Sequence, residues 1–463
     1  MHTDPAIFKA YDIRGIYQQQ ITRKTGYRLG RAFGQWIKKQ YQEKNHLEVV
    51  VGRDMRDSGQ ELEHPLVQGL CDESIKVIYI GEVSTPAMYY SVFDRNADGG
   101  IVITASHNPS QYNGFKLVKR NAEPISQASG LEEIKELVFQ GDFEQEGDEN
   151  FEQREYFATN TDYIINALTH RQSQIALRSM RIVVDSGNGM ASPVIEEFFA
   201  QFPQLELIHL YPDLDGDFPN HEANPLKEET LADLKETVKN TQADLGVACD
   251  GDFDRIAFVD DTGRTISADI TTAFLAPRIL QDYPQEPILY DLRSSNIVPE
   301  VIEQKGGKSV QTRVGHSFIK AQMREEGAAF AGEYSGHFYF RLSREGRTAY
   351  IENPLIALIK MCETISADEE RRPASEQFQD VFVYSHSGEV NFEVEDTTQT
   401  IEAIKAELSD GEISELDGIR IDYPESWVSV RASNTEPVLR VIVEGKTSQD
   451  REKLYQRVTA RII

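Results

Sequence analysis

Three times along the chain, a short run of small apolar residues ends in a polar loop. The three segments are IVITASHNP at 101–109, LGVACDGDFDR at 245–255 and AAFAGEYSGH at 328–337. Each run is typical of a buried strand and lies where strand-like stretches alternate with helical ones. Because ligands in open α/β sheets bind beyond the carboxyl ends of the strands, three such loops can face one shared cleft. The pattern predicts a series of α/β units.

The length of 463 residues corresponds to about three compact units at roughly 150 residues per domain. Alternating strands and helices over the first 120 residues, and again from 181, indicate largely parallel sheets. From about residue 375, several strands and two helices, expected at 399–408 and 448–460, indicate an α+β unit with a partly antiparallel sheet. The acidic stretch 142–155 predicts a surface loop that leads into a connecting helix, and a first domain boundary.

The chain is strongly acidic, with 48 Lys and Arg residues against 76 Asp and Glu residues and a formal net charge of −28. This charge argues against binding to nucleic acid or to an anionic membrane surface. The sequence has no apolar run of about 18 residues and no signal-peptide pattern, so we expect no membrane association. Three scattered cysteines (Cys71, Cys249 and Cys362) do not form a disulfide framework and indicate a reducing cytoplasm.

The first loop places Ser106 directly after a predicted buried strand and before His107, Asn108 and Pro109. The G-x-S-x-G pattern of a nucleophile elbow is missing, which argues against acyl transfer. As a phosphoryl carrier, a serine needs only a nearby metal and cations, because phosphoryl transfer depends mostly on positioning and electrostatics. The alternative is an ordinary serine turn that caps a helix.

The second loop carries carboxylates at Asp250, Asp252 and Asp254. In an extended segment, residues at i, i+2 and i+4 point the same way, so three oxygens can converge on one Mg²⁺, Ca²⁺ or Mn²⁺ ion. An EF-hand is excluded because Arg255 and Asp261 stand where that loop needs Gly and Glu. The alternative is an acidic surface turn, but strands on both sides would pack three like charges together, which favours a metal site.

Two further loops could contact an anionic sugar ligand. In the third, Glu333 and Ser335 offer an acceptor and a donor that suit sugar hydroxyls, and His337 could relay a proton. The fourth combines one guanidinium with three small polar side chains, which suits a phosphate dianion: Arg431, Ser433, Asn434 and Thr435. Each loop could instead be a plain turn.

The motifs taken in order resemble the α-D-phosphohexomutase family, and within it the bacterial phosphomannomutase/phosphoglucomutase branch. The matching segments span essentially the whole chain: FKAYDIRG, GRDMRDSG, TASHNPSQYNGFK, DGDFDR, VGHSFIK, GEYSGH and RASNTEPVLR. The resemblance implies three similar α/β domains with mixed sheets around a cleft, followed by a C-terminal α+β domain. We place these domains at 1–150, 151–256, 257–370 and 371–463.

The resemblance also implies a mechanism. Ser106 would carry a phosphoryl group and complete a Mg²⁺ site with the three aspartates, and the group would pass between C1 and C6 of a hexose phosphate through a bound hexose 1,6-bisphosphate. The implied substrates are mannose phosphates and also glucose phosphates. The resemblance assigns catalytic roles to five residues in all: Ser106, Lys116, Arg14, Arg255 and His316. The implied substrate-binding residues are Tyr11, Arg293, Glu333, Ser335, His337, Arg431, Ser433, Asn434 and Thr435.

Four positions depart from the family pattern, one of them Arg293, which stands where Lys is frequent and should still serve as a cation. Phe253 stands where Gly is common, Tyr334 where Met is frequent, and Glu436 where a smaller polar residue is usual. The alternatives are a phosphoglucosamine mutase, a non-catalytic sugar-phosphate binding protein and a metallophosphatase. The segments FKAYDIRG and GEYSGH argue against the first, and the retained Ser106 and aspartates argue against the second. The chain lacks the His-rich ligands of a two-metal phosphatase. Either a monomer or a dimer is compatible with the sequence.

Overall fold

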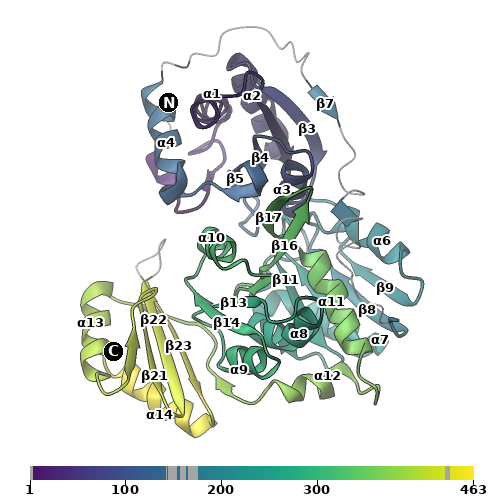
Figure 1. Cartoon of the computed structure of the whole chain (residues 1–463), viewed down its shortest axis with the longest axis vertical. Helices are drawn as coiled ribbons and strands as arrows, with labels where there is room; N and C mark the ends of the chain where they lie inside the picture. The colour runs from purple at the N-terminus through teal and green to yellow at the C-terminus, as the bar shows by residue number, and fades with distance from the viewer. Residues whose placement is uncertain are drawn as a thin grey trace. The chain divides into compact units, whose positions relative to one another are not determined.

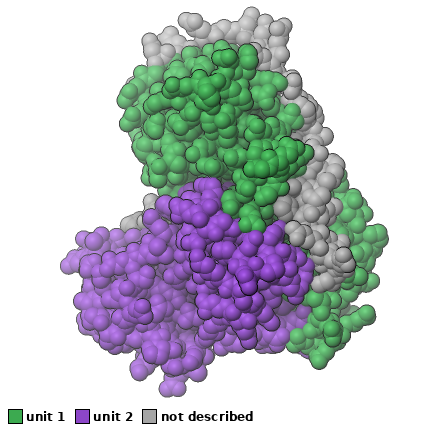
Figure 2. Space-filling model, viewed as in Figure 1, with its two compact units in different colours: residues 1–266, 335–374 green, residues 267–334, 375–463 purple. Residues whose placement is uncertain are grey.

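The computed structural model describes residues 4–141, 143, 154–156, 163–164, 176–432 and 438–462. The chain divides into two compact units, one of residues 1–266 and 335–374 and the other of residues 267–334 and 375–463 (Figure 2). None of the helices in the described part of the chain is long and apolar enough to cross a membrane.

The first sheet belongs to the first unit and is mixed. Its strands lie in the order β1 (Ile13–Ile16), β5 (Tyr112–Lys119), β4 (Gly99–Ile103), β2 (Glu48–Arg53), β3 (Lys76–Glu82) and β7 (Arg154–Tyr156), and β6 (Glu123–Pro124) pairs with β5. Strand β5 runs antiparallel to both β4 and β1, whereas β2 is parallel to its neighbours. The antiparallel return of β5 brings residues 112–119 back beside the strand that leads to Ser106.

Helices α1 (Arg23–Gln40), α2 (Asp57–Asp72), α3 (Thr85–Asp94) and α4 (Leu131–Gln140) accompany this sheet (Figure 1). Helix α1 begins with a capping box in which Thr22 and Thr25 exchange hydrogen bonds. Two glycines let α1 and α2 pack closely, because a Cβ on Gly30 would lie 2.2 Å from Leu66 O. A Cβ on Gly69 would likewise lie 2.3 Å from Tyr27 O. The helices therefore bury a continuous core against the sheet.

The second sheet, also in the first unit, carries the aspartate loop. Its strands lie in the order β12 (Thr265–Ile266), β11 (Ile256–Asp260), β10 (Leu245–Cys249), β8 (Met180–Asp185) and β9 (Leu205–Leu210). Strands β10, β8 and β9 are parallel and β11 is antiparallel to β10. Helices α6 (Ser192–Ala200) and α7 (Ala232–Thr241) complete this α/β layer.

The strands of the third sheet are divided between the units. In the second unit, β13 (Pro287–Asp291) is parallel to β14 (Lys308–Thr312) and to β15 (Phe330–Gly332). In the first unit, β16 (Phe338–Arg344) and β17 (Arg347–Glu352) form an antiparallel hairpin. The helices of this region are α8 (Ala268–Asp282), α9 (Ile297–Gln304), α10 (His316–Glu326), α11 (Pro354–Ser366) and α12 (Ala374–Gln377).

The fourth sheet, in the second unit, is antiparallel. Its order is β18 (Ser385–His386), β23 (Val438–Gly445), β22 (Ser426–Ala432), β21 (Ile419–Tyr423) and β20 (Glu412–Ser414), and β19 (Val390–Glu393) pairs with β23. Helices α13 (Thr397–Glu407) and α14 (Ser448–Thr459) flank this sheet and bury its apolar face (Figure 1).

These sheets confirm the predicted fold class, with mixed α/β sheets followed by an α+β unit. The two helices expected at 399–408 and 448–460 are confirmed within two residues at each end. The predicted loop over 142–155 lies mostly outside the described residues. Residues 154–156 form strand β7, so neither a loop nor a helix is present at that point.

Candidate active site

Ser106 lies in a loop that follows β4 and is almost fully buried, with 2 % of its surface exposed. Its backbone has φ +52°, a left-handed conformation that is uncommon for residues other than glycine. The hydroxyl donates a hydrogen bond to Asp250 Oδ2 at 2.9 Å, and the backbone N–H donates to Thr104 Oγ1 at 2.8 Å. The segment after Ser106 leads into strand β5 rather than a helix. The alternative of a helix cap is therefore wrong.

The aspartate loop connects β10 to β11, and it brings Asp250, Asp252 and Asp254 together. One carboxylate oxygen from each of the three lies within 4.8 Å of the others, and all three residues are buried. The loop is a turn rather than the extended segment predicted, because Phe253 adopts φ +56°. A positive φ is the conformation that glycine favours, and here a fully buried Phe253 adopts it. The turn still aims the three carboxylates at one point.

Backbone amides and a lysine stabilise the three negative charges. Asp250 Oδ1 accepts hydrogen bonds from the amides of Asp254 and Arg255, each at 3.0 Å. Burial and the neighbouring carboxylates nevertheless raise the pKa of Asp250 well above its usual range. Burial also opposes ionisation of Asp254, but Lys116, His337 and Arg255 together outweigh it and lower the pKa of Asp254 well below its usual range.

Lys116 lies on β5, and its Nζ is 2.6 Å from Asp252 Oδ2 and 2.5 Å from Asp254 Oδ2. Burial opposes the charged form, but the two aspartates outweigh it and raise the pKa of Lys116 well above its usual value. The ammonium therefore stays protonated and supplies the positive charge nearest the cluster. Thr85 adds a neutral donor, with its Oγ1 at 2.6 Å from Asp252 Oδ2.

The donor set fits a hard divalent cation. Asp252 Oδ1 is buried and has no hydrogen-bond partner among the described residues. An orphaned buried carboxylate oxygen is costly unless a cation or water meets it. Together with Asp250, Asp254 and the nearby Ser106 hydroxyl, it forms the all-oxygen donor set that Mg²⁺ prefers.

Two further predicted residues, Arg14 and Arg255, lie beside this cluster in the first unit. Arg14 donates to Asn108 Oδ1 at 2.6 Å and to Asp12 Oδ2 at 2.5 Å, so it is attached to the Ser106 loop. Arg255 Nε lies 3.9 Å from Asp250 Oδ2. Tyr11 is half-buried in the bend that precedes β1.

The loop at 332–337 contributes two of the predicted site residues, Ser335 and His337, to the first unit. His337 Nε2 lies 3.2 Å from Asp254 Oδ1, and its Nδ1 lies 2.9 Å from Ser335 Oγ. The sequence predicted both residues for sugar binding, and the structure places His337 directly against an aspartate of the cluster.

His107 was not among the predicted site residues. Its Nδ1 lies 3.2 Å from Ser106 Oγ. Burial, reinforced by Arg255 and Arg14, lowers the pKa of His107 well below its usual value, so the ring is neutral. The position of His107 immediately after Ser106 in the sequence is the signal that could have identified it.

A second group of predicted residues gathers in the second unit around Arg293. Its guanidinium is buried and contacts Asp291 Oδ2 at 2.7 Å and Glu333 Oε1 at 3.3 Å. Its third carboxylate neighbour is Glu389, at 3.7 Å. The Arg293 guanidinium also lies 5.5 Å from the centre of the Tyr334 ring. Glu333 therefore takes part in a network of charges anchored by Arg293.

Arg431, at the end of β22, shares Glu389 with this network. Its guanidinium lies 3.4 Å from Glu389 Oε2 and 3.5 Å from Asp417 Oδ2, and Arg440 Nη1 lies 3.3 Å from Glu389 Oε1. Ser433, Asn434 and Thr435, and the departure at Glu436, lie outside the described residues. His316 is the first residue of α10, and it is half-buried.

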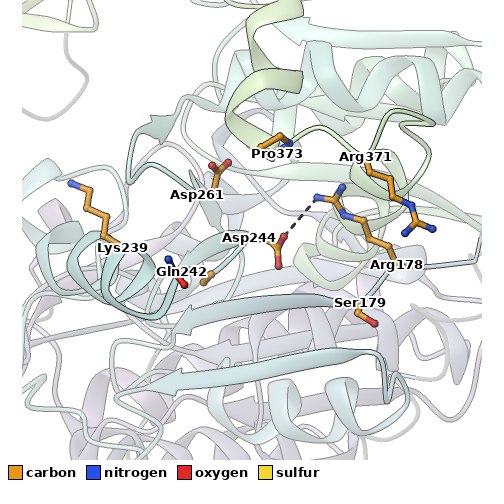
Figure 3. Close-up of a pocket in the computed structure, with 9 residues that line it drawn as sticks. Arg178, Ser179, Lys239, Gln242, Asp244, Asp261, Arg371 and Pro373 are labelled. Atoms are coloured by element: carbon orange, nitrogen blue, oxygen red, sulfur yellow. Dashed lines mark ion pairs between the residues drawn. The ribbon is translucent and has the colours of Figure 1, made fainter.

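A separate hollow of about 730 Å³ lies in the first unit (Figure 3). Its lining includes Arg178 and Asp244, which form an ion pair at 3.7 Å, together with Lys239 and Arg371. Asp244 precedes β10, whereas the aspartate loop follows it, so this hollow lies at the opposite end of that strand. None of the predicted site residues lines it.

Comparison with known families covers nearly the whole chain. Residues 5–145, 161–263 and 267–384 match the alpha/beta/alpha domains I, II and III of phosphoglucomutase/phosphomannomutase, and residues 389–461 match its C-terminal domain. The chain belongs to the phosphoglucomutase/phosphomannomutase family of phosphohexomutases.

Individual relatives align over more than nine-tenths of their length. A phosphomannomutase of Methanocaldococcus jannaschii is 37 % identical over 100 % of this chain and 99 % of its own length. A phosphomannomutase/phosphoglucomutase of Pseudomonas syringae is 34 % identical over 97 % of this chain and 93 % of its own length. The crystal structure of a phosphoglucomutase/phosphomannomutase family protein from Burkholderia thailandensis superposes with a TM-score of 0.88 at 30 % identity, covering 99 % of this chain and 97 % of that one.

Proposed function

We propose that this phosphohexomutase moves a phosphoryl group reversibly between C1 and C6 of mannose phosphates and of glucose phosphates, through a phosphoserine at Ser106 and a bound hexose 1,6-bisphosphate. The observation that carries the proposal is the buried hydrogen bond between Ser106 Oγ and Asp250 Oδ2, 2.9 Å long, at the edge of the three-aspartate cluster. Relatives named phosphomannomutase or phosphomannomutase/phosphoglucomutase support the choice of sugars.

In the first half-reaction, the bond between phosphorus and Ser106 Oγ breaks. A new bond forms between phosphorus and the free hydroxyl oxygen of the hexose phosphate, and the proton of that hydroxyl leaves. The product is the bisphosphate, and Ser106 regains its proton. In the second half-reaction the other phosphate returns to Ser106 by the same steps in reverse. No net phosphate or water is consumed.

Mg²⁺ held by Asp250, Asp252 and Asp254, with one phosphoserine oxygen, would withdraw negative charge from the phosphoryl group during transfer. Lys116 keeps its charge in the buried cluster, so it is the candidate to neutralise the phosphoryl oxygens, and as an ammonium it would handle the proton as a donor. Arg14 and Arg255 add cations around Ser106, and His316 is a second candidate for acid–base work.

Substrate recognition is assigned to groups that both orientations of the sugar can share. Glu333 and Ser335 would bind the O3 and O4 hydroxyls, with His337 beside them. The distal phosphate would be held by Arg431, Ser433, Asn434 and Thr435, with Arg293 and Tyr11 completing the ligand contacts. Because no residue is assigned to the C2 hydroxyl, mannose and glucose phosphates should both be accepted. We expect no nucleic-acid or membrane partner, a cytoplasmic location, and either a monomer or a dimer.

The test compares Ser106→Ala with Ser343→Ala, which changes an exposed serine on β16. Mannose 1-phosphate and glucose 1-phosphate are assayed with Mg²⁺ and a hexose 1,6-bisphosphate activator, and intact mass is measured after incubation with the bisphosphate. We expect wild type and Ser343→Ala to gain the mass of one phosphate and to turn over both sugars, and Ser106→Ala to do neither. A wild-type protein that gains no phosphate would refute the proposal.

A further inference from the structure

Arg56 donates four hydrogen bonds to the Ser106 loop and the start of β5, whereas Arg14 donates one. It lies at the N-terminal end of α2 and is 1 % exposed. Its guanidinium donates to four backbone carbonyl oxygens within 106–112, at distances of 2.5–3.1 Å: those of Ser106, Asn108, Pro109 and Tyr112.

These bonds fix a segment whose backbone lies almost entirely outside helices and strands. Residues 106–111 form turns between β4 and β5, and Ser106 adopts φ +52°. A carbonyl buried without a donor is costly, so the guanidinium satisfies several groups at once and fixes their relative positions. The planar fork of arginine makes this possible, whereas an ammonium cannot reach four carbonyls in one plane.

Asp54 in turn fixes the position of Arg56. Its Nε donates to Asp54 Oδ2 at 3.2 Å, and the backbone N–H of Arg56 donates to Asp54 Oδ1 at 3.0 Å. The Phe218 ring lies 5.0 Å from the guanidinium carbon, and a Cβ on Gly216 would come within 2.7 Å of the Arg56 Cα. The five N–H donors of the side chain are thus committed to protein oxygens, and none remains for a substrate phosphate.

We propose that Arg56 is a positioning residue that fixes the backbone of the Ser106 loop, so that Ser106 Oγ faces the aspartate cluster. The inference rests on the proposed function, because the rate of phosphoryl transfer is its kinetic consequence. It predicts that the shape of the guanidinium matters, and that its charge alone does not suffice.

The experiment compares Arg56→Lys with Arg53→Lys. Arg53 is a buried arginine three residues away that pairs with Glu63 and Glu82, and in the described part of the chain its side chain makes no hydrogen bond or ion pair with residues 106–112. We expect Arg56→Lys to lower kcat about 100-fold, the cost of displacing a reacting group by roughly 1 Å, with KM changed less than about threefold. Arg53→Lys should leave kcat within about threefold of wild type.

Hydrogen exchange of the amides at 104–114 gives a readout that does not depend on activity. Faster exchange in this segment in Arg56→Lys, and not in Arg53→Lys, is expected. Unchanged exchange and unchanged kcat in folded Arg56→Lys would overturn the proposal, as would a rise in KM at constant kcat, which would make Arg56 a substrate ligand. Equal losses in both variants would show a general effect of buried arginines and would also overturn it.

If Arg56→Lys does not fold, Asp54→Asn tests the same idea by loosening the anchor of the guanidinium. It should accelerate exchange at 104–114 and lower kcat, and failure to do either overturns the proposal. If the wild-type protein shows no mutase activity and no phosphate on Ser106, the proposed function fails. The exchange data then decide separately whether Arg56 fixes the loop.

Discussion

Two clusters of charged residues differ in burial and in the length of their contacts. The Ser106 cluster, in the first unit, consists of Ser106, Lys116 and the three aspartates, and the Arg431 cluster, in the second unit, consists of Arg293, Arg431, Arg440 and Glu389. In the first, Ser106 and the three aspartates are buried. The hydroxyl of Ser106 lies 2.9 Å from Asp250, and Lys116 lies 2.6 Å from Asp252 and 2.5 Å from Asp254. In the second, the Glu389 and Arg440 side chains are 20 % and 31 % exposed, and the contacts of Glu389 span 3.3–3.7 Å.

The difference matches two different proposed tasks. Phosphoryl transfer needs a fixed geometry at the reacting oxygen, because small displacements cost large factors in rate. A site that holds the non-reacting phosphate must accept the substrate in two orientations, and looser, partly exposed contacts suit that requirement. Three predictions test this contrast, from the largest expected effect to the smallest, and a fourth tests the His221–Asp185 ion pair, which lies outside both clusters.

Asp252→Asn should lower kcat about 1,000-fold, the upper range for loss of one preorganised electrostatic group, and should abolish most of the rise in Tm that Mg²⁺ produces. The cause is the loss of a buried charge from the three-oxygen cluster. Enzyme assays and thermal unfolding with and without Mg²⁺ measure both effects. Asp217→Asn, at an exposed aspartate, is the matched control. If Mg²⁺ raised the Tm of Asp252→Asn as much as that of wild type, the cluster would not be the Mg²⁺ site.

Lys116→Met should lower the free energy of unfolding by about 3 kcal/mol, because removing one partner of a buried ion pair leaves the other uncompensated. Mg²⁺ should restore part of that loss by supplying a replacement positive charge. Denaturant unfolding with and without Mg²⁺ measures this. Lys119→Met, on the same strand but one-third exposed and paired with Glu123, should have little effect. Equal destabilisation of both variants would contradict a special role for Lys116.

Glu389→Gln should tighten binding of inorganic phosphate about threefold, since it removes one partly screened negative charge beside Arg293, Arg431 and Arg440. Calorimetric titration with phosphate measures this directly, and KM should fall in parallel without a change in kcat. Glu393→Gln, at an exposed position on β19, is the control. Weaker phosphate binding would instead mean that Glu389 holds the arginines in place.

His221 gives the smallest expected effect. Burial opposes its charged form, but Asp185, at 3.0 Å, outweighs burial and raises the pKa of His221 above its usual value. A raised folded-state pKa stabilises the fold at low pH, and this stabilisation is lost as pH rises through that pKa. The stability difference between wild type and His221→Gln should therefore be larger at pH 5.5 than at 8.5, by less than about 1 kcal/mol. The reverse trend would refute the assignment.

Much of the first cluster could be predicted from the sequence, because its signal is local. A buried strand followed by polar residues identified both the Ser106 loop and the aspartate loop. The backbone conformation within each loop could not be predicted in the same way. The aspartates converge through a turn at Phe253 with positive φ rather than through an extended segment.

Long-range contacts were the other limit. Lys116 meets Asp252 across 136 positions of sequence, and strand β5, which presents it, was not predicted. The acceptors of Arg56 within 106–112 are backbone carbonyl oxygens. Because every residue has one, the residue types at 106–112 do not reveal these contacts. His337 was predicted from its loop, but only the structure shows that it meets Asp254.

The spacing of these contacts along the chain has a consequence for biosynthesis. Arg56 and the loop carbonyls it holds are separated by 50–56 positions, all within the first sheet and its loops. The partners of Lys116, Asp252 and Asp254, lie 136 and 138 positions later in the sequence. At 5–20 residues per second, the ribosome synthesises them roughly 7–28 s after Lys116. On the ribosome, the serine loop can therefore take its shape first, while its neighbouring ammonium is still hydrated and unpaired. The two charges of opposite sign meet only when the second domain has emerged.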